Sequence, residues 1–314
     1  MKATSIEKYR GRFAPSPTGP LHLGSMITAV ASYLQAKSQD GHWLLRMDDI
    51  DTPRVVTGAT DAILHTLIRF KMHWDESIVY QSQQQPHYQA ALEQLAYQNN
   101  IYHCLCSRKH IASIAKPGPY GPIYPGKCQH RKQRPGHDRS AIRLNTNATR
   151  IIINDKLQGS ISQNIQQDIG DFVIQRADGI FSYQLSVVVD DYQQAITEIV
   201  RGFDLLDSTP RQVYLQQLLH FPTPSYAHIP ILVNPQGQKL SKQNFAAAVP
   251  HHHPEKTLLK VFQLLGLNPP TELQRETLDT LWCWAIEHWQ LTAIPRVNTI
   301  MVNPEDTPAY TRSV

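Results

Sequence analysis

Residues 11–25 read Gly-Arg-Phe-Ala-Pro-Ser-Pro-Thr-Gly-Pro-Leu-His-Leu-Gly-Ser, and this stretch decides the fold class. Its first four residues predict a short buried strand, residues 15–20 are rich in turn formers, and residues 22–37 predict a helix. Loops that join a strand to a helix often bind phosphates in α/β sheets, because backbone N–H groups and the helix N-terminus point at the ligand. We therefore expect a nucleotide site here.

The pattern of strand and helix continues on both sides of the central region of the chain. Buried strands are expected at 42–47, 197–202 and 228–233, amphipathic helices at 57–71 and 210–219, and a hairpin at 172–189 around the Asp-Gly pair at 178–179. Strands that alternate with helices predict an α/β fold with a Rossmann-like parallel sheet.

Two further regions have a different composition. Residues 101–165 are rich in Pro, Gly and basic residues and predict a loop-rich insertion, whereas residues 246–314 carry two apolar stripes at the helical period. We expect Cys283 to belong to the core of these helices. The predicted organisation is a first half of the Rossmann-like domain at 1–100, the insertion at 101–165, the second half of that domain at 166–245 and a small C-terminal helical domain at 246–314.

The composition is that of a globular protein with a weak basic excess. The chain has 314 residues, 41% of them hydrophobic, and a formal net charge of +4. No apolar run is long enough to span a bilayer and the N-terminus has no signal-peptide pattern, so we expect a cytoplasmic protein without a membrane partner. Six basic residues and one acidic residue in 127–143 indicate either a solvated loop or a surface for phosphates.

A second motif far downstream completes a recognisable pair. Residues 239–243 read Lys-Leu-Ser-Lys-Gln, and two lysines around a serine are suited to a triphosphate and its pyrophosphate product. With His22-Leu23-Gly24-Ser25, in this order, the sequence resembles the class I aminoacyl-tRNA synthetases. The resemblance implies ATP with Mg²⁺, a catalytic set of His22, Lys239 and Lys242, and an ATP-binding set of His22, Gly24, Ser25, Ser241 and Lys242.

Two longer sequence motifs indicate which amino acid is the substrate. Residues 12–19, Arg-Phe-Ala-Pro-Ser-Pro-Thr-Gly, and residues 45–54, Leu-Arg-Met-Asp-Asp-Ile-Asp-Thr-Pro-Arg, resemble the signatures of the glutamyl branch. Two carboxylates and an ammonium call for fixed guanidinium groups, a carboxylate and hydroxyls. By resemblance, the L-glutamate site comprises Arg12, Ala14, Ser16, Asp48, Tyr183 and Arg201. Asp48 stands where the family usually has glutamate, which shortens the reach of that carboxylate.

Three clustered cysteines predict a structural zinc site. Cys104, Cys106 and Cys128 supply three thiolates, and a tetrahedral site needs a fourth ligand. Chemistry alone offers His103, His110 or His130 as that ligand. The family pattern C-x-C…Y-x-x-x-C instead implies Tyr124.

The number of residues that follow the second motif indicates which position of the RNA accepts the amino acid. The 69 residues beyond 245 leave no room for the large anticodon-binding region of full-length glutamyl enzymes. The chain resembles instead the short glutamyl-queuosine tRNA(Asp) synthetases, which implies transfer of glutamate to queuosine in the anticodon of tRNA(Asp). We also expect a monomer. The alternatives are a truncated glutamyl-tRNA synthetase that charges a 3′ end, a glutaminyl enzyme, and a non-catalytic zinc-containing tRNA-binding module.

Overall fold

The N-terminal part of the chain forms a parallel sheet. The computed structural model describes residues 8–119, 121–130, 139–240 and 247–303. Strands β1 (Arg10–Phe13), β2 (His42–Met47) and β3 (Val79–Tyr80) pair in parallel in that order, and α1 (Leu23–Lys37) and α2 (Ala59–Arg69) connect them. The strand, loop and helix predicted from residues 11–37 are therefore confirmed.

A second parallel pair extends this sheet on the β1 side. Strands β9 (Glu198–Gly202) and β10 (Ser225–Ile229) are joined through α6 (Thr209–Leu219). The amide of Thr197 donates to the carbonyl of Arg10 at 2.9 Å, which places β9 beside β1. The carboxyl ends of β1 and β9 consequently lie at the same edge, which is where α/β sheets bind their ligands.

The predicted strand at 228–233 is in fact two strands. β10 ends at Ile229, and β11 (Ile231–Val233) pairs with β12 (Thr299–Met301) instead of continuing along β9. Pro230 lies between them, and a proline has no N–H to donate to a ladder, so the chain changes sheets there.

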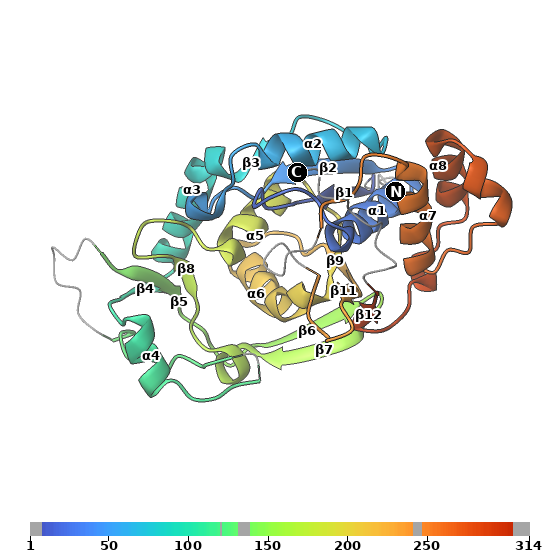
Figure 1. Cartoon of the computed structure of the whole chain (residues 1–314). Helices are drawn as coiled ribbons and strands as arrows, with labels where there is room; N and C mark the ends of the chain where they lie inside the picture. Colours follow the sequence, from blue (N-terminus) through green and yellow to red (C-terminus); the bar gives the residue numbers. More distant parts are fainter. Residues whose placement is uncertain (1–7, 120, 131–138, 241–246, 304–314) are drawn as a thin grey trace, which may run out of the picture.

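The segment predicted as a loop-rich insertion contains more strand than we expected. Strands β4 (Ile101–Cys104), β5 (Ala141–Leu144) and β8 (Val173–Gln175) form an antiparallel sheet, and β6 (Arg150–Asp155) and β7 (Gly159–Asn164) form a hairpin. The short helix α4 (Arg108–Ile114) lies at the end of the molecule opposite α8, while the β6–β7 hairpin runs below the parallel sheet (Figure 1).

The predicted hairpin at 172–189 is wrong in its second arm. A tight turn does form, with Gly179 at φ +88°, but the pairing stops at a single bridge between Gln175 and Phe181. From Tyr183 the chain is helical, as α5 (Tyr183–Gln193). The run of valines at 187–189 is typical of a strand, yet burial against α3 (Gln85–Tyr97) and α6 outweighs that propensity.

The two C-terminal helices pack on the N-terminal part of the chain. α7 (Pro254–Leu264) and α8 (Leu278–Glu287) share one hydrophobic core with α1, β1 and β2. Both predicted stripes are buried, but Cys283 is exposed, so its assignment to the core is wrong. The proposed domain boundaries remain predictions. Within the described residues, no helix combines the length and apolar character needed to cross a bilayer.

Candidate active site

A cavity of about 670 Å³ opens at the carboxyl ends of β1 and β9. Ten residues that the sequence singled out line it together: Arg12, Ala14, Ser16, His22, Gly24, Ser25, Asp48, Tyr183, Arg201 and Lys239. Ser241 and Lys242 lie outside the described residues. The structure thus brings the two distant motifs and the predicted glutamate residues into one site, and their individual roles remain predictions.

The first motif is held rigidly by the start of α1. His22 is the N-cap, and its Nδ1 accepts a hydrogen bond from the amide of Ser25 at 3.2 Å. The Ser25 hydroxyl accepts in return from the amide of His22 at 2.8 Å, which closes a capping box. Because Nδ1 is an acceptor, a neutral His22 ring carries its hydrogen on Nε2 and can donate it to a phosphate. The sequence indicated Ser25 as an ATP residue and missed its capping role.

The second motif lies against the first. A Cβ placed on Gly24 would lie 2.9 Å from the carbonyl oxygen of Leu240, and the amide of Val249 donates to the carbonyl of Leu21 at 2.8 Å. Lys239 pairs with Asp204 at 2.5 Å, at the same edge of the cavity. Leu240 therefore lies close to the N-terminus of α1, and helix N-termini favour phosphate binding.

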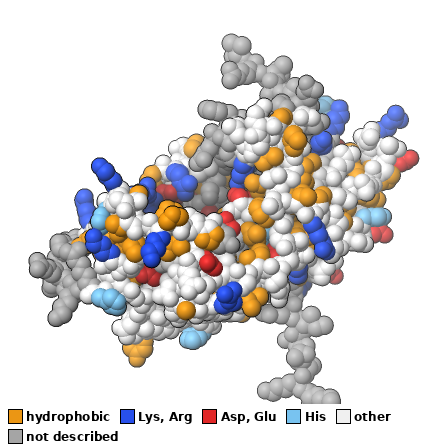
Figure 2. Space-filling view, turned by 90° about the horizontal axis from the view of Figure 1, so that it is seen from below, with side chains coloured by type: hydrophobic (Ala, Val, Ile, Leu, Met, Phe, Trp, Pro, Cys, Tyr) orange, Lys and Arg blue, Asp and Glu red, His pale blue; other side chains and the backbone are white. Residues whose placement is uncertain are grey.

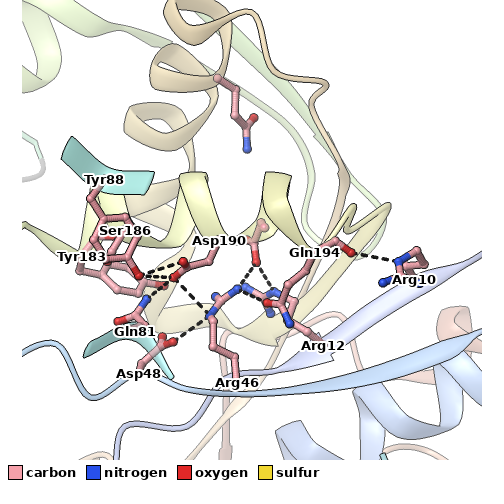
Figure 3. Close-up of polar contacts among 12 residues, drawn as sticks. Arg10, Arg12, Arg46, Asp48, Gln81, Tyr88, Tyr183, Ser186, Asp190 and Gln194 are labelled. Carbon is pink, nitrogen blue, oxygen red and sulfur yellow. Dashed lines mark hydrogen bonds and ion pairs between the residues drawn. The ribbon is translucent and has the colours of Figure 1, made fainter. Parts of the chain in front are cut away.

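Buried charges surround Arg12 and Asp48, two residues that line the cavity. Arg12 on β1 donates to Asp191 at 3.0 Å, and Arg46 on β2 donates to Asp191 at 2.8 Å and to Asp48 at 2.9 Å. Figure 3 shows the Arg12 and Arg46 side chains rising from the sheet toward α5. Burial raises the pKa of the Asp48 carboxyl, although Arg46 opposes this shift. For Asp191 burial also raises the pKa, but the two guanidinium groups outweigh it and the pKa is lowered.

Three of these charged residues were not assigned from the sequence: Arg46, Asp190 and Asp191. Arg46 is fully buried and lies between Asp48 and Asp190 (Figure 3). Asp190 accepts hydrogen bonds from Tyr88 at 2.8 Å and from Gln81 at 2.7 Å, and burial raises its pKa to about 6. Two adjacent aspartates directly after three valines could have indicated buried charges in the site. The predicted hairpin led us to assign this segment no role.

Arg201, at the end of β9, is held without a carboxylate partner. Its Nε donates to Nε2 of His228 at 3.0 Å, and its Nη2 donates to the Thr209 hydroxyl at 2.7 Å. Its buried Nη1 has no hydrogen-bond partner among the described residues. A cation that borders the cavity with one donor unused is suited to a carboxylate ligand.

The three predicted thiols meet at the edge of the β4–β5 sheet. The sulfurs of Cys104, Cys106 and Cys128 lie within 4.8 Å of one another, and Cys106 and Cys128 are 3.6 Å apart. The Tyr124 hydroxyl is 3.4 Å from Cys104 and 3.3 Å from Cys106. Ligands of a tetrahedral zinc ion are roughly 3.5–3.8 Å apart, so these four residues fit zinc. His103 and His110 bond elsewhere, to Ser140 and Lys127 respectively.

The basic stretch at 127–143 divides between surface and interior. Lys127 and Arg139 are exposed, whereas Arg143 is buried over the ring of Tyr124 at 4.1 Å and donates to the carbonyl of Asp171. Arg143 therefore does not belong to a phosphate-binding surface, and 131–138 fall outside the described residues. Figure 2 shows Lys and Arg side chains standing out at the left end of the face seen from below.

Comparison with known proteins agrees with this arrangement. Residues 8–278 match the model of the class I tRNA synthetases (E and Q), catalytic domain. The chain belongs to this family. It is thus a class I synthetase-type ligase, and its fold, with the cavity at the carboxyl ends of β1 and β9, is the catalytic domain of that class.

Individual relatives refine the picture. The synthetase is 47% identical to the glutamyl-Q tRNA(Asp) synthetase of Dechloromonas aromatica, over 94% of this chain and 98% of the relative. It is 48% identical to the enzyme of that name from Chromobacterium violaceum, over 91% and 95%. Among solved structures, the glutamate–tRNA synthetase of Elizabethkingia anophelis superposes with a TM-score of 0.79 at 25% identity, over 96% of this chain and 69% of that one.

Proposed function

We propose that this synthetase activates L-glutamate with ATP and transfers it to the queuosine base in the anticodon of tRNA(Asp). The observation that supports it most is a single cavity lined both by His22, Gly24 and Lys239 of the two motifs and by Arg12 and Arg201. Relatives that carry the glutamyl-Q tRNA(Asp) name match this chain over nearly their whole length, whereas the glutamate–tRNA synthetase is matched over 69%.

The first step joins glutamate to AMP. An oxygen of the α-carboxylate attacks the α-phosphorus of ATP, the bond from that phosphorus to the β-phosphate oxygen breaks, and pyrophosphate leaves. No protein nucleophile takes part, so catalysis rests on positioning and on charge stabilisation. Mg²⁺ arrives with the ATP phosphates. His22, Lys239 and Lys242 stabilise the developing charge, Ser241 completes the phosphate contacts, and Gly24 lets the loop approach the helix.

The second step uses the activated carbonyl. A cyclopentenediol hydroxyl of queuosine attacks the carbonyl carbon of the mixed anhydride, the acyl–phosphate bond breaks, and AMP leaves with the electron pair while the hydroxyl proton passes to a phosphate oxygen of the departing AMP. Arg12 and Arg201 hold the carboxylates of glutamate, and Asp48 accepts from its ammonium, assisted by Ser16 and Tyr183. Cys104, Cys106, Cys128 and Tyr124 would hold a structural zinc ion, which would order the edge of the β4–β5 sheet.

Transfer of labelled glutamate to tRNA tests the proposal. With ATP and queuosine-containing tRNA(Asp), nuclease mapping should place the label in the anticodon fragment, and tRNA(Asp) that lacks queuosine should stay unlabelled. Label on the 3′-terminal adenosine would instead indicate a short glutamyl-tRNA synthetase. Absence of both label and ATP–pyrophosphate exchange would favour a non-catalytic RNA-binding module. Exchange that depends on glutamine would indicate a glutaminyl enzyme.

The second motif has its own test. Lys242→Ala should slow adenylate formation strongly, by about 100-fold or more if the lysine stabilises the leaving pyrophosphate, while glutamate binding changes little. A single-turnover assay measures the rate of adenylate formation, and calorimetry measures the affinity for glutamate. Loss of glutamate binding with turnover preserved would contradict this role.

A further inference from the structure

Arg201 differs from the other arginines of the site in how its charge is balanced. Arg12 and Arg46 both pair with aspartates, which neutralise much of their charge. The partners of Arg201 are a histidine nitrogen, a threonine hydroxyl and a backbone carbonyl, all of them neutral acceptors. The positive charge of Arg201 is therefore not neutralised by a protein carboxylate, and its Nη1 can donate a hydrogen bond to an anionic ligand.

His228 must be neutral to hold Arg201 in this way. Its Nε2 accepts from a guanidinium N–H, so the ring hydrogen resides on Nδ1, which donates to Oδ2 of Asp155 at 2.6 Å. Both side chains are fully buried. Burial, helped by the charge of Arg201, lowers the pKa of His228 to about 4 although Asp155 opposes the shift. The ring thus accepts from Arg201 at neutral pH.

Asp155 is itself fixed by the turn that follows β6. Its Oδ1 accepts from the amides of Leu157, Gln158 and His228 at 3.0, 2.9 and 3.2 Å. Three amide donors leave the carboxylate little freedom, and they use the oxygen that does not contact the ring. The β6–β7 hairpin, which lies outside the parallel sheet (Figure 1), consequently reaches the ligand site through one residue.

We infer that Asp155 and His228 are positioning residues for glutamate recognition. Asp155 fixes the hydrogen of His228 on Nδ1, His228 fixes Arg201, and Arg201 presents Nη1 to a carboxylate of the substrate. The inference rests on the proposed function, since the ligand is the glutamate named there. Neither residue touches the substrate, and both act through the orientation and undiminished charge of Arg201.

Substitutions at His228 distinguish the effect of its hydrogen bonds from the effect of its side-chain volume. His228→Leu has similar volume and loses the ring contacts with Arg201, Thr209 and Asp155, so the KM for glutamate should rise by about 10- to 100-fold with the KM for ATP unchanged. His228→Gln can accept from Arg201 with its oxygen and donate to Asp155 with its amide, so its KM for glutamate should stay within about threefold of wild type. ATP–pyrophosphate exchange, with queuosine-containing tRNA(Asp) present, measures each KM.

Asp155→Asn tests the hydrogen placement while the variant keeps the shape of the side chain. The amide oxygen can still accept from the turn amides, but the amide nitrogen would face Nδ1 as a donor. The ring hydrogen is then driven to Nε2, opposite the N–H of Arg201, so the KM for glutamate should rise as in His228→Leu. Gln158→Ala is the matched control: it removes the side-chain hydrogen bond to the backbone carbonyl of His228, at 2.8 Å, and keeps the backbone amide that donates to Asp155, so both KM values should stay at wild-type level.

A double-substitution cycle decides whether His228 acts through Arg201. His228→Leu added to Arg201→Ala should raise the KM for glutamate no further than Arg201→Ala alone. Independent, multiplicative effects would overturn the inference, and so would a fall in kcat with the KM for glutamate unchanged in all variants. If wild type shows no glutamate-dependent exchange or transfer, the proposed function fails and the positioning role fails with it. An active wild type whose KM is unaffected by Asp155→Asn and His228→Leu overturns the positioning role alone.

Discussion

At the scale of single residues, buried neighbours set the protonation state of each charged group in the site. His228 and Asp190 are shifted in opposite senses. Burial lowers the pKa of His228 to about 4, whereas burial raises the pKa of Asp190 to about 6. Burial thus disfavours the charged form of both groups: His228 is neutral at pH 7, whereas Asp190 stays largely ionised there beside Arg46.

Stability should therefore depend on pH through His228 with a defined sign. Its folded pKa is depressed, so the unfolded chain binds more protons between pH 6.5 and about 4. The contribution of His228 to the free energy of unfolding is present above pH 6.5 and is lost as pH falls through 4. Its size is about 3 kcal/mol at most. Asp190 acts with the opposite sign: its stabilisation is present below pH 3.8 and is lost as pH rises through about 6.

Comparison with a variant isolates the histidine. Urea unfolding of wild type and of His228→Gln across this range should give a difference in unfolding free energy that grows with pH, because the titration of Asp190 is common to both proteins. Curves that remain parallel from pH 4 to 6.5 would show that the folded pKa of His228 is not depressed.

At the scale of elements, the N-terminus of α1 lies against the backbone of Leu240. The capping box fixes His22, and Gly24 allows the backbone of Leu240 to approach. Gly24→Ala should force this contact apart at a cost of about 1–3 kcal/mol, equivalent to a roughly 5- to 150-fold rise in the KM for ATP. Glutamate affinity, measured by calorimetry, should not change. An unaltered KM for ATP would mean that the two motifs move independently.

The thiol cluster is a second unit at this scale, and it should bind one metal ion. Cys128→Ser should reduce zinc content from about one per chain to near zero, because three thiolates and Tyr124 complete a tetrahedral site. Cys283→Ser is the control, since Cys283 is exposed and distant from the cluster. Elemental analysis after dialysis gives the stoichiometry. Equal zinc in Cys128→Ser and wild type would exclude this site, and loss of zinc in Tyr124→Phe would identify the fourth ligand.

At the scale of the whole molecule, the C-terminal helices stabilise the catalytic sheet. α8 and α1 contribute to the same hydrophobic core, and Trp282 packs at 4.8 Å from Tyr33 between ring centroids. Leu281→Ala should therefore lower the unfolding free energy by about 2–5 kcal/mol. Tryptophan fluorescence and loss of ATP–pyrophosphate exchange should follow the same urea transition.

Cys283→Ala is the matched control on the same helix. Its side chain is exposed, so stability should change by no more than about 0.5 kcal/mol. If Leu281→Ala instead produced an early fluorescence transition with activity retained, the C-terminal helices would be an independent domain, as the boundary at 246 predicts.

The sequence by itself determined the local features of this protein. The strand, loop and helix of residues 11–37, the strand at 42–47 and the cysteine triad follow from periodicity, turn chemistry and ligand type, all of which are properties of short stretches. Family resemblance then supplied the pairing of two motifs about 215 residues apart (239 minus 24), and the structure places both at one cavity.

Only the tertiary structure decided how charges are balanced inside the site. Asp191 meets Arg12 across 179 residues, and Asp155 meets His228 across 73. Sequence periodicity does not predict hydrogen bonds over such separations, because they depend on which strand ends and helix faces the fold brings together. For the same reason the start of α5 was predicted to be the second arm of a hairpin: its helical form is stabilised by packing against α3 and α6, a contact that local propensity does not contain.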